Sequence, residues 1–241
     1  MKQQVFIIGG GSAFDTHEAY IESLKKREVS LEKLSFKDWK GNLPTNLGDS
    51  FEVYFLQMPN RFNARYLEWK IWFEKYVPYM QDNCIFVGHS LGGVFFAKYL
   101  SEEILQKKVR ATFLVAAPYN TATNHPYVDF NINKPLTSFE SQGGQIFLYQ
   151  SRDDQSVPFS NLADYVRELP NATVRIFDNR GHFNDEQFPE IVEDIKYLTA
   201  SVPPLAETSW FCMRPVRSIA SCPLKYSRPG WPGWAQRESR K

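Results

Sequence analysis

A serine stands between two glycines in the stretch Gly88-His89-Ser90-Leu91-Gly92, directly after the apolar run 84–87. Between a strand and a helix, the pattern Gly-x-Ser-x-Gly holds the serine on a sharp turn with its hydroxyl exposed at the end of a sheet. Residues 91–106 are expected to form that helix, because their apolar side chains recur at helical spacing without proline. The sequence therefore predicts a nucleophilic serine at position 90. An ordinary glycine turn between strand and helix is the alternative.

A serine hydroxyl is a weak nucleophile, so the chemistry needs a base, an acid that orients the base, and donors for an oxyanion. In α/β-hydrolases the acid and the histidine follow the serine, each after its own strand. Asp153 and Asp154 follow the apolar run 145–149, and Val-Pro three and four positions after Asp154 favours that residue. Asp153 is the competitor, and two solvated aspartates in a turn are the structural alternative.

One histidine has the position that the base requires. His182 follows the apolar run 173–177 and precedes a helical pattern, whereas the other three histidines come before both aspartates in the chain. Taken alone, a histidine in a Gly-His-Phe turn would more often be a surface residue. The ordered set Ser90, Asp154 and His182 predicts a catalytic triad.

Two backbone N–H groups are needed to hold the oxyanion. We expect one from Leu91, the residue after the serine, and one from the glycine loop after the first strand, where Gly11 is the candidate. A phosphate-binding loop is the alternative for glycines between a strand and a helix. The loop has neither Gly-x-Gly-x-x-Gly nor a Lys-Ser/Thr ending, which disfavours that alternative.

Six short apolar runs alternate with helical patterns along the chain. The runs are continuous, which is typical of parallel strands buried on both faces. The expected strands are residues 5–8, 51–56, 84–87, 111–116, 145–149 and 173–177, and the expected helices are residues 15–27, 64–81, 91–106, 161–169 and 185–200. This alternation predicts a three-layer α/β/α sandwich around a mostly parallel six-stranded sheet.

Two segments interrupt the alternation. Residues 28–50 are polar and contain two glycines and a proline, so we expect a surface excursion with Phe36 and Trp39 against the body. Residues 118–144 form a long aromatic loop that should lie over the same sheet edge as Ser90, and loops of this length are usually functional or disordered.

The pocket walls should come from loops near the serine. The candidate substrate-binding residues are Ser12, Phe14, Met58 and Tyr119. The aromatic content of these loops favours an apolar acyl or aromatic group in the substrate.

Length and composition are those of a globular chain with one main domain. The 241 residues include 43% hydrophobic and 23% charged residues, and the formal net charge of +1 gives no case for nucleic acid or a membrane surface.

Residues 201–241 differ in composition from the rest of the chain: they carry seven basic and two acidic side chains, together with repeated prolines and tryptophans. We expect an α/β-hydrolase domain over residues 1–200 and a basic tail over residues 201–241 that is disordered or non-native. A docking tail is the alternative.

Three cysteines do not make a disulfide framework. Cys84 lies in an apolar run and is expected to be a core residue. Cys212 and Cys222 could pair, but nothing in their spacing requires it. No metal-ligand spacing or cofactor motif is present. The short apolar run near residue 5 does not fit a signal peptide, and a cytoplasmic protein is the expectation.

Six short motifs also occur in the order and spacing of a known group of proteins. They are Ile7-Ile8-Gly9-Gly10-Gly11, Met58-Pro59, Gly88-His89-Ser90-Leu91-Gly92-Gly93, Val115-Ala116-Ala117-Pro118, Asp153-Asp154 with Val157-Pro158, and Gly181-His182-Phe183. Over about residues 4–200 the chain resembles the small serine hydrolases of the retinoblastoma-binding protein nine type. The resemblance implies Ser90 as nucleophile, Asp154 as acid and His182 as base. It also implies a minimal α/β-hydrolase fold with strand order 2-1-3-4-5-6 and no large lid domain.

These observations lead to one hypothesis and one alternative from another class. The hypothesis is a serine hydrolase, carboxylesterase-like, that cleaves small esters, thioesters or activated amides through an acyl-enzyme and uses no cofactor. The alternative is a catalytically weak hydrolase fold that acts as a protein-binding module, because fold alone does not secure activity. No particular protein partner is indicated.

Overall fold

The computed structural model describes residues 1–119 and 129–199. Six strands form one sheet in the order β2-β1-β3-β4-β5-β6, and all five neighbouring pairs are parallel. The strands are β1 (Gln3–Ile8), β2 (Phe51–Leu56), β3 (Cys84–His89), β4 (Val109–Val115), β5 (Gln145–Ser151) and β6 (Thr173–Phe177). The expected fold class and strand order are confirmed.

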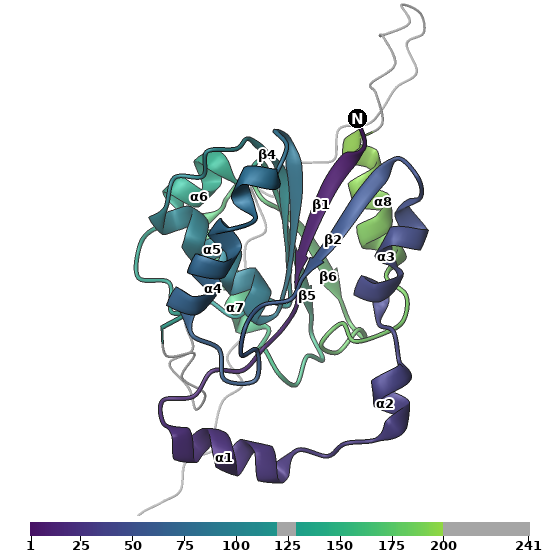
Figure 1. Cartoon of the computed structure of the whole chain (residues 1–241). Helices are drawn as coiled ribbons and strands as arrows, with labels where there is room; N and C mark the ends of the chain where they lie inside the picture. The colour runs from purple at the N-terminus through teal and green to yellow at the C-terminus, as the bar shows by residue number, and fades with distance from the viewer. Residues whose placement is uncertain (120–128, 200–241) are drawn as a thin grey trace, which may run out of the picture. The chain divides into compact units, whose positions relative to one another are not determined.

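Helices cover both faces of the sheet, and two short helices lie beyond its carboxyl edge (Figure 1). On one face lie α3 (Trp39–Leu47) and α8 (Pro189–Thr199); on the other lie α4 (Tyr66–Glu74), α5 (Leu91–Glu102), α6 (Thr137–Gln142) and α7 (Ser160–Glu168). Beyond the edge lie α1 (His17–Lys26) and α2 (Leu31–Ser35). The three layers predicted from the sequence are therefore present.

The sheet is buried on both faces because successive strand residues point in opposite directions. In β1, Val5 and Ile7 join the core under α3 and α8, whereas Phe6 and Ile8 join the core on the other side. All four side chains are at most 4% exposed. This burial explains why the strands appear in the sequence as continuous apolar runs.

The single helix expected over residues 64–81 is two elements. The first is α4, and the second is the 3-10 turn η1 (Val77–Tyr79). Pro78 lies in the second element. A proline ring has no N–H and clashes with the carbonyl four residues earlier, so an α-helix cannot continue through this point undisturbed.

Residues 28–50 contain helices where an irregular excursion was expected, and that expectation was wrong. Asp38 caps α3, since its carboxylate accepts hydrogen bonds from the N–H groups of Lys40 and Gly41 at 3.1 and 3.4 Å. Trp39 and Leu43 lie one turn apart on the buried face and are each 1% exposed. The expected packing of Trp39 is thus confirmed. Phe36, 54% exposed, does not pack as expected.

Several expectations fall partly or wholly outside the described residues. In the predicted loop 118–144 the structure shows α6, and residues 120–128 are not described. The tail 201–241 is also outside, with both of its cysteines, so its predicted character and the domain boundary near residue 200 stay predictions. Over the described ranges, every helix is too short or too polar to cross a membrane.

Candidate active site

Ser90 forms the corner between β3 and α5. Its φ of 55° and ψ of −121° lie in a region that residues with a side chain rarely adopt, and such strain is typical of functional turns. Backbone hydrogen bonds hold the corner: the Ser90 N–H donates to the Val115 carbonyl at 2.8 Å, and the Gly93 N–H donates to the Ser90 carbonyl at 2.9 Å.

The two glycines that flank the serine are needed for close packing. A Cβ on Gly88 would lie 2.6 Å from the Gly92 carbonyl oxygen, and a Cβ on Gly92 would lie 2.2 Å from the Ile8 carbonyl oxygen. Real Cβ atoms do not approach backbone so closely, so any larger residue would displace the turn. The structure thus has a strand–turn–helix corner of the kind that the motif predicts.

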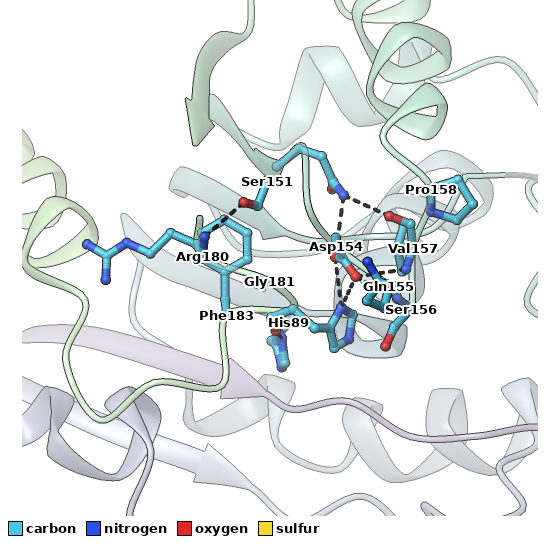
Figure 2. Close-up of polar contacts among 12 residues, drawn as sticks. His89, Ser151, Asp154, Gln155, Ser156, Val157, Pro158, Arg180, Gly181 and Phe183 are labelled. Atoms are coloured by element: carbon cyan, nitrogen blue, oxygen red, sulfur yellow. Dashed lines mark hydrogen bonds and ion pairs between the residues drawn. The ribbon is translucent and has the colours of Figure 1, made fainter. Parts of the chain in front are cut away.

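The loops after β5 and β6 bring an aspartate to a histidine (Figure 2). The Asp154 carboxylate lies 2.9 and 3.1 Å from His182 Nδ1. Its Oδ1 atom also accepts from the N–H groups of Ser156 and Val157 at 2.8 and 2.9 Å. Asp154 is 8% exposed, and its partners keep it aimed at the imidazole.

Asp153 faces a different set of groups. Its Oδ1 atom accepts from the Ser151 hydroxyl at 2.5 Å and from the Gly181 N–H at 2.9 Å. The hydrogen bond from Ser151 is the main cause that lowers the pKa of the Asp153 carboxyl, and the Gly181 bond adds to it. Asp153 therefore ties the β5 loop to the loop that carries His182, and of the two aspartates only Asp154 contacts the His182 imidazole.

Ser90 and His182 line the same cavity, which has a volume of about 580 Å³. No hydrogen bond joins Ser90 Oγ to His182 among the described residues. Such bonds are often loose without substrate and tighten in the reacting complex. The three side chains of the predicted triad thus meet at one edge of the sheet, from three different strand ends.

The glycine loop lies against the serine, but the nearest residue is one position earlier than expected. A Cβ on Gly10 would lie 3.2 Å from Ser90 Cβ and 3.5 Å from Ser90 Oγ. A Cβ on Gly11 would instead meet the Arg61 carbonyl at 2.7 Å and the Leu91 side chain at 3.0 Å. Leu91 begins α5, as the elbow requires. The predicted role of Gly11 stays a prediction, with Gly10 as the rival that lies closer to Ser90.

Sequence reasoning missed three residues that support the histidine loop. The Trp39 indole donates to the Phe183 carbonyl at 2.8 Å, and His89 Nε2 lies 2.8 Å from the His182 carbonyl. Lys40 Nζ lies 3.4 Å from His89 Nδ1. An ammonium can only donate, so Nδ1 of His89 accepts the hydrogen bond from Lys40. The ring proton is then on Nε2 of His89, which donates a hydrogen bond to the His182 carbonyl oxygen.

Burial is the main cause that lowers the pKa of His89, and electrostatic interactions with Lys40 and His182 lower it further. His89 is therefore a neutral hydrogen-bonding spacer and not a second base. The signal for this support lay in the sequence: Asp38 is a capping residue, followed by apolar residues at positions 39, 43 and 47 with helical spacing.

Of the four predicted substrate-binding residues, the structure places one in the lining of the cavity. Ser12 lines the cavity with Ser90, whereas Phe14, Met58 and Tyr119 do not. Met58 is 8% exposed, and Tyr119 is 7% exposed with its hydroxyl bonded to Glu168 at 2.7 Å. Phe14 packs against Tyr20 with ring centroids 5.8 Å apart. Within the described ranges, no group of three or more His, Cys, Asp or Glu side chains could hold a metal ion.

Comparisons with known proteins identify the family of this chain. A family model described as serine hydrolase matches residues 35–199. The chain is 26% identical over 198 residues to YdeN of Bacillus subtilis (strain 168), covering 79% of this chain and 92% of YdeN. The crystal structure of that protein superposes with a TM-score of 0.64 and 19% identity, covering 83% of this chain and all of the other.

More distant solved structures share the fold. Est1E from Butyrivibrio proteoclasticus has a TM-score of 0.52 at 12% identity and covers 82% of this chain and 87% of its own. A structure from a study of carboxylesterases of the Thaumarchaeon Nitrososphaera gargenis has a TM-score of 0.53 at 12% identity, with 83% and 90% covered. The family match spans more than half of the sequence and includes the strained Ser90, so this chain belongs to the serine hydrolase family, of the retinoblastoma-binding protein nine and YdeN type.

Proposed function

We propose that this protein is an esterase that works through Ser90, His182 and Asp154. The observation that carries the proposal is the Asp154–His182 hydrogen bond at 2.9 Å, in which His182 lines the same cavity as a strained serine. Each member comes from a different strand end, and chance rarely brings these three side chains together in that order.

In the proposed reaction, His182 takes the proton from Ser90 Oγ as that oxygen attacks the ester carbonyl carbon. The carbonyl oxygen becomes an oxyanion, held by the N–H of Leu91 and a second N–H from the glycine loop. Collapse breaks the bond to the leaving alcohol, which receives the proton from His182. Water then attacks the acyl-enzyme by the same steps, releasing the acid and regenerating Ser90.

Asp154 has an orienting part in this scheme. It accepts the Nδ1 proton of His182, which leaves Nε2 free to act as the base toward Ser90. It also stabilises the imidazolium that forms during each half of the reaction. The two backbone donors at Ser156 and Val157 keep the carboxylate from rotating away.

Carboxylic esters are the substrate class that we favour. One related fold comes from a study of carboxylesterases, and Est1E has been solved with bound ferulic acid. Thioesters and activated amides pass through the same tetrahedral intermediate and are the secondary class. A catalytically weak binding module is the rival function, which the intact set of three side chains disfavours.

A fluorophosphonate probe tests the proposal, because it labels only a serine that a base has activated. We expect the folded wild-type protein to be labelled, and the label to be lost in Ser90→Ala. Hydrolysis of a 4-nitrophenyl ester should fall in that variant by a factor on the order of 10⁴ or more. A well-folded wild-type protein that stays unlabelled and inactive would favour the binding module.

A further inference from the structure

The cavity that contains Ser90 has a basic lining. Four basic residues line it, and one acidic residue, Asp38, lies among them. Asp38 is bound to the Lys40 ammonium at 2.5 Å, so these two charges neutralise each other. The other three, Arg27, Lys37 and Arg61, are exposed side chains that we call the cationic wall.

This wall contrasts with the rest of the domain. The whole chain carries a formal net charge of +1, and its last 41 residues hold seven basic and two acidic side chains. Residues 1–200 therefore carry a net charge of −4. Positive charge gathered at one cavity of an acidic domain attracts and orients anions there.

Two members of the wall share one aromatic ring. The guanidinium carbon of Arg27 lies 4.7 Å from the centroid of the Phe62 ring, and that of Arg61 lies 5.0 Å from it. Both distances suit cation–π contacts, which hold a guanidinium in place and leave its N–H groups free for a ligand. Arg27 uses one of its N–H groups to bond Ser12 Oγ at 3.0 Å.

Neither guanidinium is neutralised in the described part of the chain, where no ion pair reaches Arg27 or Arg61. Two positive charges beside one ring repel each other, and an anion between them would relieve the repulsion. Arginine presents a planar fork of donors that matches a carboxylate with two parallel hydrogen bonds.

The backbone links the Arg61 segment of this wall to the loop beside Ser90. The Ser12 N–H donates to the Arg61 carbonyl at 2.8 Å, which joins the Arg61 segment to the end of the glycine loop. Gly10 in that loop lies against Ser90.

We propose that the cavity binds esters that carry a free carboxylate, and that Arg27 and Arg61 hold that carboxylate while Ser90 attacks the ester carbonyl. This inference rests on the proposed function and specifies its substrate class. It also revises the apolar preference expected from the loop sequences, because Phe62 supports the two cations and need not contact an acyl chain.

A matched pair of substrates tests the inference. 4-Nitrophenyl hydrogen adipate and 4-nitrophenyl hexanoate have the same chain length and leaving group, and only the adipate ester has a terminal carboxylate. We expect wild-type kcat/KM to favour the adipate ester by roughly tenfold or more, as for a charge-assisted hydrogen bond. Arg61→Gln and Arg27→Gln should each reduce this ratio by roughly tenfold, and added salt should reduce it in the wild type.

Arg167→Gln is the matched control. It makes the same charge change on α7, where Arg167 pairs with Asp164 at 2.7 Å and lies outside the cavity lining. Its substrate ratio should equal that of the wild type. Equal rates on the two esters, or a ratio unchanged in both cavity variants while the fluorophosphonate still labels Ser90, would overturn the inference alone. A folded wild type that is not labelled overturns the proposed function instead.

Discussion

The two sides of the cavity are built in different ways. At the strand ends, Ser90 lines the cavity and Asp154 lies behind His182; both are 8% exposed and tied by backbone hydrogen bonds. The cationic wall, by contrast, is exposed, and aromatic contacts hold its two arginines. The contrast suggests that the chemistry depends on a rigid strand-end frame, while substrate choice depends on a wall that can change without disturbing that frame.

The largest effect should come from the sheet side. We expect Asp154→Asn to reduce kcat by about 10⁴-fold, because an amide in this position favours the wrong tautomer of His182. Steady-state kinetics on 4-nitrophenyl hexanoate will measure the loss. Fluorophosphonate labelling of Ser90 should slow in parallel.

Asp153→Asn is the control for that measurement. It removes the neighbouring negative charge and weakens bonds to Ser151 and Gly181, but it leaves the Asp154–His182 contact in place. A loss of less than about tenfold is expected. Equal losses in the two variants would show that the loop connection, and not the acid, dominates.

An intermediate effect should come from α3, which joins the two sides. Trp39→Phe removes the indole donor to the Phe183 carbonyl and leaves that buried oxygen unpaired, which should lower the free energy of unfolding by about 1–3 kcal/mol. We also expect kcat to fall more than KM rises, because His182 precedes the loosened carbonyl. Chemical denaturation and kinetics will measure both changes.

Trp72→Phe provides the comparison, since Trp72 also donates its indole N–H to a carbonyl, that of Gln57 at 3.0 Å, and is 39% exposed. Its loss should cost less stability and leave kcat near the wild-type value. If Trp39→Phe leaves kcat unchanged despite a loss of stability, α3 is a packing element with no part in placing the histidine.

The smallest effect concerns pH and His89. Burial lowers its pKa in the folded protein, with Lys40 and His182 adding to the shift, so the unfolded chain binds the proton more readily. Stability from this residue is full above the ordinary pKa of about 6.5 and is lost as pH falls below it, by at most about 1.4 kcal/mol per pH unit. The free energy of unfolding should therefore decline between pH 7.5 and 5.5.

His89→Gln keeps an amide donor for the His182 carbonyl but has no titrating proton, so its stability should depend less on pH in this interval. Urea denaturation at both pH values will measure the difference between the two proteins. The same slope in wild type and variant would show that other groups cause the decline.

Much of the fold could be predicted from the sequence because its signals are local. Continuous apolar runs indicated buried parallel strands in a three-layer arrangement, which the structure has. The strand order came instead from the family resemblance, and it is the order observed. The exceptions have local causes too. Pro78 prevents the long helix expected over residues 64–81 from continuing. The capped helix α3 was missed because its segment contains glycines and a proline, which favour loops.

The sequence by itself determined the order of serine, acid and histidine and the strand that precedes each. It thereby predicted that the three residues lie together, because a parallel sheet brings all its carboxyl ends to one edge. Only the tertiary structure decided between Asp153 and Asp154 as the partner of His182, since adjacent side chains in a loop can face different neighbours. The tertiary structure also brought the cationic wall together. Arg27 and Arg61 lie 34 positions apart in the sequence and meet over the Phe62 ring through chain packing, which a local sequence pattern cannot predict.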